Sequence, residues 1–176
     1  MTMTPAENAT RPRAVLIGPP GSGKTTIGKL LADRLGVGFR DTDADVEATA
    51  GKTVSDIFVE DGEEHFRELE AAAVRLALAE HDGVLALGGG AILRPETQEL
   101  LAGHTVVYLE VGLGEAVERV GLGAARPLLV LNPRARLRKL MEQRRPIYER
   151  LATLRVSTEG REPDEIVERI VKELPA

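Results

Sequence analysis

The segment GPPGSGKT at residues 18–25 constrains this chain more than any other part of its sequence. It matches G-x-x-x-x-G-K-[S/T] and lies between an apolar run, which predicts a strand, and an amphipathic stretch, which predicts a helix. Glycines let successive backbone N–H groups curl around phosphate oxygens at a helix N-terminus, whose dipole favours negative charge. The motif therefore predicts a phosphate-binding loop, with Lys24 on the β and γ phosphates and Thr25 on Mg²⁺. The alternative, an ordinary glycine-rich turn, is disfavoured by the flanking strand and helix.

Short runs rich in Val, Leu and Ile alternate with longer amphipathic stretches, a pattern typical of a parallel sheet covered by helices. The apolar runs predict strands at residues 13–17, 37–40, 84–87, 105–111 and 153–157. The other stretches predict a short helix capped by Ser55 and helices at 24–35, 63–80, 95–101, 132–150 (broken near Pro146) and 164–174. We therefore predict an α/β fold of the P-loop NTPase type, with three α/β/α layers around a five-stranded parallel sheet.

The chain is expected to form one domain preceded by a tail. Residues 1–12 are polar, hold two prolines and show no periodicity, which predicts a disordered tail. Residues 13–176 have the length of a single domain. Four glycines bracket the segment after the fourth strand, and we predict a mobile lid at about 112–131.

Composition excludes several functional classes. The 176 residues include 23 basic and 28 acidic ones, a net charge of −5, and 3% are aromatic, so a nucleic-acid surface is not expected. With no cysteine and three histidines that lack metal-site spacing, disulfides, thiolate chemistry and histidine-held metals are not expected. No apolar run approaches the roughly 20 residues of a membrane span, and residues 1–10 lack the apolar centre of a secretory signal. We expect a cytoplasmic protein with no nucleic-acid or membrane partner.

Three carboxylates, Asp41, Asp43 and Asp45, follow the second predicted strand. Because parallel strands end at one edge of the sheet, this segment is expected to face the phosphate loop. One carboxylate could hold a water of Mg²⁺, and another could take the proton of an attacking hydroxyl. Helix capping combined with solvated charge is the alternative.

Two further features point to an anionic ligand. Between residues 126 and 150 the chain holds eight basic residues and two acidic ones. Arg126 and Arg144 precede prolines that limit backbone freedom, whereas the arginines at 134–138 are typical of a solvated helix face. The glycines at 88–90 follow the third strand and would let a ligand lie against the backbone, although a simple loop remains the alternative.

Together these motifs resemble the shikimate kinases. The resemblance rests on GPPGSGKT, Asp41-Thr42-Asp43, Phe66-Arg67, the three glycines, Arg126-Pro127-Leu128 and Arg144-Arg145-Pro146-Ile147-Tyr148, and it extends from about residue 13 to the C-terminus. It implies a monomeric kinase that phosphorylates the 3-hydroxyl of shikimate with ATP and Mg²⁺ in aromatic amino-acid biosynthesis.

The resemblance also implies a role for particular residues. Asp43 would hold the ring hydroxyls and act as base, Arg67 and Arg144 would bind the substrate carboxylate, and Arg126 would reach ATP from the lid. The full expected ATP site is Gly21, Ser22, Gly23, Lys24, Thr25, Thr26, Arg126 and Arg161, the last on the adenine side. The expected shikimate site is Asp43, Arg67, Gly89, Gly90 and Arg144, and the Mg²⁺ positions are Thr25 and, through water, Asp41. Lys24 and Arg126 would assist Asp43 in catalysis.

Other functions remain open on the residues alone. A gluconate kinase or a nucleoside monophosphate kinase would keep the phosphate loop and change the acceptor pocket. A hydrolytic switch or motor is disfavoured, because the third strand ends in Gly88 rather than in an aspartate. A nucleotide-binding module without catalysis is the remaining alternative.

Overall fold

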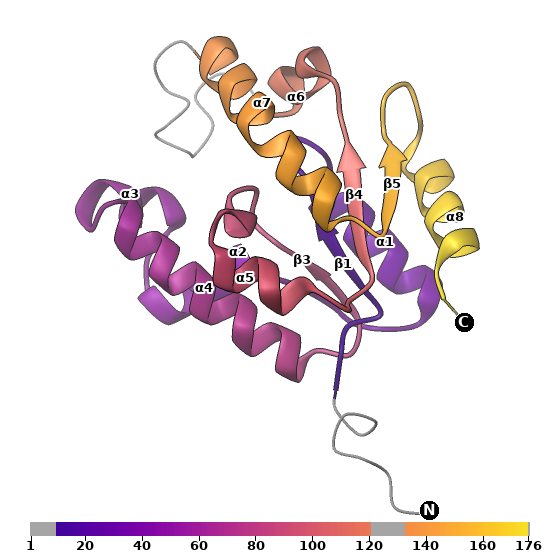
Figure 1. Ribbon diagram of the computed structural model, residues 1–176, viewed down its shortest axis with the longest axis horizontal. Coiled ribbons are helices and arrows are strands. Elements are labelled where there is room, and N and C mark those ends of the chain that lie inside the picture. The colour runs from indigo at the N-terminus through magenta and orange to yellow at the C-terminus, as the bar shows by residue number, and fades with distance from the viewer. Residues whose placement is uncertain (1–9, 121–132, 176) are drawn as a thin grey trace, which may run out of the picture.

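The computed structural model describes residues 10–120 and 133–175, which form a sheet with helices on both faces (Figure 1). The sheet has five strands in the order β2-β3-β1-β4-β5, and every pairing is parallel. The strands are β1 (Ala14–Ile17), β2 (Phe39–Asp41), β3 (Val84–Ala86), β4 (Val106–Glu110) and β5 (Leu154–Ser157). The prediction of a five-stranded parallel sheet is confirmed.

The helices divide between the two faces of the sheet. They are α1 (Lys24–Leu35), α2 (Thr42–Ala50), α3 (Val54–Glu60), α4 (Glu63–Glu80), η1 (Ala91–Leu93), α5 (Pro95–Leu101), α6 (Leu113–Val120), α7 (Pro133–Leu151) and α8 (Pro163–Glu173). Helices α1 and α8 pack against one face, and α4, α5 and α7 supply side chains to the cluster on the other. This arrangement confirms the predicted three layers.

The central strand β1 shows how the sequence produces this layering. Ala14 and Leu16 belong to the cluster under α1 and α8, and Val15 and Ile17 belong to the cluster on the opposite face. Successive side chains of a strand point to opposite faces, so a strand with helices on both sides must be apolar at every position. Full burial of each larger aliphatic side chain contributes about 1.5–3 kcal/mol.

Three short elements were not predicted. Helix α2 has little amphipathic character, since only Thr42 and Val46 of it are buried. Helix α6 occupies the start of the segment expected to be a lid, and residues 121–132, including Arg126, lie outside the described residues. The 3-10 helix η1 is too short for periodicity to reveal.

The predicted break at Pro146 is wrong, because α7 continues through it to Leu151. A proline removes one main-chain hydrogen bond from a helix. Here Arg144 and Tyr148, on either side of Pro146, are 5% and 1% exposed, so both halves of α7 are held by packing.

The predicted tail falls mostly outside the description, which begins at residue 10. Pro12, expected to belong to that tail, is buried, and Arg11 donates to the Gly103 carbonyl. Among the residues that the structure describes, no helix is both long and apolar enough to cross a membrane.

Candidate active site

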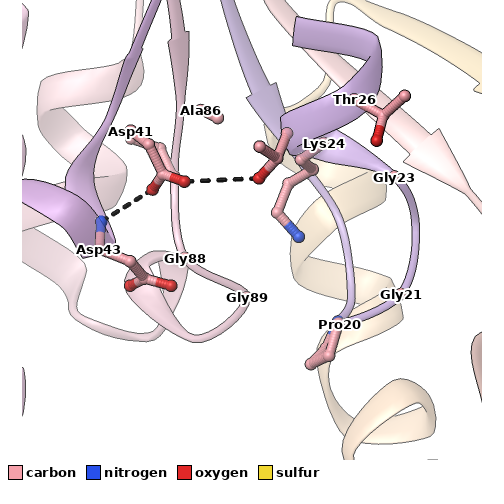
Figure 2. Close-up of a pocket in the computed structure, with 12 residues that line it drawn as sticks. Pro20, Gly21, Gly23, Lys24, Thr26, Asp41, Asp43, Ala86, Gly88 and Gly89 are labelled. Carbon is pink, nitrogen blue, oxygen red and sulfur yellow. Dashed lines mark hydrogen bonds between the residues drawn. The ribbon is translucent and has the colours of Figure 1, made fainter. Parts of the chain in front are cut away.

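The glycine-rich loop joins β1 to α1 at the edge where the strands end (Figure 2). Gly21 and Gly23 have φ of 81° and 89°, a left-handed conformation that favours glycine. Gly23 is the N-cap of α1 and no side chain caps this helix, so its positive end can face an anion. The Lys24 Nζ donates to the carbonyls of Gly18 at 2.7 Å and Pro19 at 3.1 Å, so the lysine bends back over the loop.

A cavity of about 360 Å³ opens between this loop, the start of α2 and the glycines after β3 (Figure 2). It brings together segments that are far apart in the sequence because the strands that precede them are parallel and end at the same edge. Its lining residues are Pro20, Gly21, Gly23, Lys24, Thr25, Thr26, Asp41, Asp43, Ala86, Leu87, Gly88 and Gly89. The phosphate loop and the aspartate segment therefore face one another, as the sequence predicts.

Asp41 uses its two carboxylate oxygens differently. Oδ1 accepts the N–H of Asp43 at 2.9 Å and so caps α2, while Oδ2 accepts the hydroxyl of Thr25 at 3.5 Å. Burial raises the pKa of Asp41, and the nearby charge of Asp43 raises that pKa further. The capping alternative therefore holds for Oδ1, while Oδ2 lies against Thr25 of the phosphate loop.

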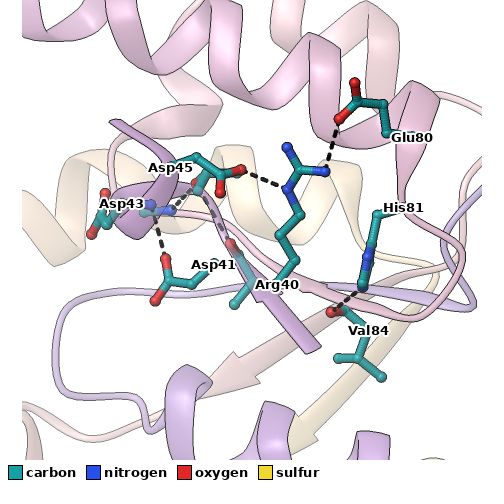
Figure 3. Close-up of polar contacts among 10 residues, drawn as sticks. Arg40, Asp41, Asp43, Asp45, Glu80, His81 and Val84 are labelled. Atoms are coloured by element: carbon teal, nitrogen blue, oxygen red, sulfur yellow. Dashed lines mark hydrogen bonds and ion pairs between the residues drawn. The ribbon is translucent and has the colours of Figure 1, made fainter. Parts of the chain in front are cut away.

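The third carboxylate of the segment lies elsewhere. Asp45 accepts Arg40 Nε at 2.7 Å, and Arg40 also pairs with Glu80 at 3.0 Å (Figure 3). The hydrogen bond that Arg40 donates to Asp45 raises the pKa of Arg40 above its ordinary value. Asp45 is not among the residues that line the cavity. Of the three aspartates, Asp41 and Asp43 therefore line the cavity, and Asp45 forms a structural ion pair with Arg40.

Two buried arginines lie against the glycines at 88–90. A Cβ added to Gly90 would be 2.5 Å from both terminal nitrogens of Arg67, and one added to Gly89 would be 3.4 Å from Arg144 Nη1. Arg67 and Arg144 are 8% and 5% exposed. A side chain at Gly90 would therefore displace the Arg67 guanidinium, whereas at Gly89 the tightest contact would be with Pro20 Cδ at 3.0 Å.

Glu70 is a site residue that the sequence analysis missed. It is 2% exposed and accepts Arg67 Nη1 at 2.8 Å. A Cβ on Gly88 would be 2.7 Å from Asp43 Oδ1 and 2.9 Å from Glu70 Oε2, so both carboxylates approach this glycine. The available signal was a charged pair three residues apart on the face of α4 that also carries Phe66 and Val74.

The remaining expected residues are distributed around this centre. Arg161 lies in a second cavity, of about 280 Å³, that shares Gly23 and Thr26 with the first. Ser22 is buried in the loop and also lines that cavity. Arg134, Arg136 and Arg138 are exposed on α7, as predicted for a solvated face. Arg126 lies outside the described ranges.

Comparisons with known proteins agree with this geometry. A family model described as shikimate kinase matches residues 20–175. A shikimate kinase from Thermobifida fusca is 64% identical over 168 residues, which cover 96% of this chain and 98% of that protein. A solved shikimate kinase from Acinetobacter baumannii in complex with shikimate has a TM-score of 0.88 at 34% identity, covering 95% of this chain and 94% of that one. A gluconokinase from Sinorhizobium meliloti, at 20% identity and a TM-score of 0.56, shares the fold alone, over 90% of this chain and 89% of its own.

Proposed function

Because this chain belongs to the shikimate kinase family, we propose that it transfers the γ-phosphate of ATP to the 3-hydroxyl of shikimate, a step of aromatic amino-acid biosynthesis. The observation that carries the proposal is the single cavity in which Lys24 and Thr25 of the phosphate loop face Asp43. Next to it, Arg67 and Arg144 lie against the glycines at 88–90. A triphosphate and a carboxylated alcohol fit the two halves of this arrangement.

The phosphate half is suited to positioning rather than to covalent chemistry. Phosphoryl transfer passes through a loose transition state whose charge spreads over the equatorial oxygens, so cations and fixed N–H donors supply most of the catalysis. The Lys24 ammonium would exchange the carbonyls of Gly18 and Pro19 for phosphate oxygens when ATP binds. Asp43, across the cavity, would accept the proton of the attacking hydroxyl.

The acceptor half is suited to a carboxylate. Arginine's planar fork matches a carboxylate, and each charge-assisted hydrogen bond contributes about 1.5–3 kcal/mol. Glu70 pairs with Arg67 at 2.8 Å, so this guanidinium is oriented before the substrate arrives. The glycines at 88–90 allow the ligand to approach the main chain directly.

The residues near Thr25 fit Mg²⁺. The Thr25 hydroxyl and the Asp41 carboxylate are oxygen donors 3.5 Å apart, and burial together with Asp43 raises the pKa of Asp41, which a cation would reverse. Mg²⁺ is usually held by one or two protein oxygens, waters and substrate phosphates. Bound there, it would neutralise charge on the transferring phosphate.

We also propose that Arg161 borders the adenine, that Arg126 reaches ATP from the lid, and that the protein is a monomer.

The test is a coupled assay of ADP release with shikimate, gluconate and the nucleoside monophosphates as acceptors. We expect turnover with shikimate alone. Two buried arginines and a carboxylate suit an acidic polyol better than a phosphorylated nucleoside, and membership of the shikimate kinase family favours shikimate over gluconate. Turnover with gluconate or with a nucleotide but not with shikimate would contradict the proposal. Tight ATP binding with no turnover on any acceptor would favour a non-catalytic module.

Replacement of Arg144 by alanine is expected to weaken shikimate binding by about tenfold or more, with little change in ATP affinity. The reason is that Arg144 is buried against Gly89 and faces the acceptor half of the site. The matched control is Arg145→Ala, the same change one residue later at an exposed position. Isothermal titration of both variants with shikimate and with ATP measures the effect. Equal losses for the two variants would contradict this role.

A further inference from the structure

The glycines at 88–90 form a turn whose central peptide has two accessible orientations. The N–H of Ala91 donates to the Gly88 carbonyl at 3.1 Å, which closes a β-turn with Gly89 and Gly90 at its centre. Gly90 has φ −99° and ψ 4°, the values expected for a type I turn. A type II turn differs by a flip of the central peptide and needs positive φ at this position, which glycine adopts readily. The sequence of this turn therefore permits both forms.

One side chain holds that central peptide in place. The hydroxyl of Tyr148 donates to the Gly89 carbonyl, with 2.5 Å between the two oxygens. Tyr148 is 1% exposed, and its ring stacks on that of Tyr108 with centroids 5.1 Å apart. It lies on α7 one turn after Arg144, so both side chains project from one face of the helix. The donor of this hydrogen bond is therefore a rigid, buried group.

The orientation of this peptide decides what the turn presents to a ligand. A peptide group is planar and trans, so fixing the Gly89 carbonyl also fixes the Gly90 N–H in the opposite direction. Within the described part of the chain, the N–H groups of Gly89 and Gly90 donate to no protein acceptor, although both glycines are buried. Buried N–H groups are rarely left unpaired, and Gly89 lines the cavity, so these two N–H groups are donors that an acceptor bound there would satisfy. A flipped peptide would present a carbonyl oxygen where the Gly90 N–H now points.

We propose that Tyr148 is a positioning residue for the acceptor, which it serves by holding the Gly88–Ala91 turn in the type I form. The carboxylate or hydroxyls of shikimate then meet an N–H donor beside Arg67 and Arg144 instead of a repelling carbonyl. This inference rests on the proposed function, because it takes the glycine turn to be part of the shikimate site. Tyr148 acts through Gly89 and not on the reacting atoms.

The test compares Tyr148→Phe with Tyr108→Phe, in the wild-type background. Each change removes one hydroxyl from the same stacked pair of rings, but only Tyr148 donates to the glycine turn. For Tyr148→Phe we expect KM and Kd for shikimate to rise about five-fold, as for the loss of one buried hydrogen bond. KM for ATP is expected to stay within about twofold of wild type. Tyr108→Phe is expected to leave all these values close to wild type.

Each other outcome is decisive. Wild-type affinity for shikimate in Tyr148→Phe would overturn the inference. Equal weakening by both variants, or parallel losses of shikimate and ATP binding with a loss of folded structure by circular dichroism, would show a packing role alone and would also overturn it. Failure of the proposed function would be distinguishable from failure of this inference. In that case the wild-type protein itself would release no ADP with shikimate.

Discussion

Replacement of Asp43 by asparagine is expected to lower kcat by roughly 10²-fold or more while leaving ATP affinity nearly unchanged. Asparagine keeps the shape of the side chain but cannot accept the proton of the attacking hydroxyl. Asp43 lines the cavity opposite Lys24, and its main-chain N–H, which stays in the variant, continues to bind Asp41. The measurement is kcat at saturating shikimate, together with the Kd of ATP by titration.

The matched control for this prediction is Asp45→Asn. Asp45 lies two residues later in the same helix and pairs with Arg40, away from the cavity. We expect its kcat to remain within a few-fold of wild type, with a modest loss of stability, since a partly exposed ion pair contributes about 0.2–1 kcal/mol. A kcat for Asp43→Asn that equals that of Asp45→Asn would refute the assignment of Asp43 as the base.

Replacement of Lys24 by methionine is expected to lower kcat by about 10²–10³-fold, the usual loss when one group that stabilises developing charge is removed. ATP affinity should fall as well, because the ammonium would contact the β and γ phosphates in the ground state and in the transition state. Single-turnover phosphate transfer at saturating ATP separates the two effects. The fold should persist, since Lys24 is only half-buried and lies outside both large core clusters.

Lys52→Met provides the comparison for Lys24→Met. Lys52 pairs with Glu60 and Asp61 beside α3, and those acids raise its pKa. Its loss removes the same charge from the protein but none from the cavity, so catalysis is expected to stay close to wild type. Similar defects in both variants would mean that net charge, rather than a contact of Lys24 with phosphate, governs the rate.

The parts of the fold that local patterns determine were predictable. Strand β1 is apolar at every position, and the phosphate-loop motif fixes both its end and the start of α1. Helix α2 was missed because the periodicity signal needs a buried stripe, and this helix buries only Thr42 and Val46. Its start was nonetheless visible in Asp41, a residue type that caps helices.

The site was only partly predictable because several roles depend on contacts between distant segments. Asp45 pairs with Arg40, five residues before it, and the more distant contact is that of Arg40 with Glu80 on α4. Composition alone does not show which of Asp43 and Asp45 is paired in this way. Glu70 carries no motif and becomes significant only because Arg67 and Gly88 lie beside it. Arg144 lies beside Gly89 only because α7 packs next to the glycine turn, and no local pattern in the sequence shows that packing. Motifs indicate the chemistry, and tertiary contacts determine which residues lie at the cavity.

The Arg67–Glu70 pair has a consequence for attempts to make this protein more heat-resistant. It is embedded in the side of α4 that also carries Phe66 and Val74, so two ions have been withdrawn from water there. Exchanging a buried ion pair for well-fitting aliphatic residues is often neutral or favourable for folding. A screen that rewarded melting temperature alone would therefore tend to replace both residues, and with them the arginine that we propose binds the substrate carboxylate. Mutagenesis for higher thermal stability would have to leave Arg67 and Glu70 unchanged.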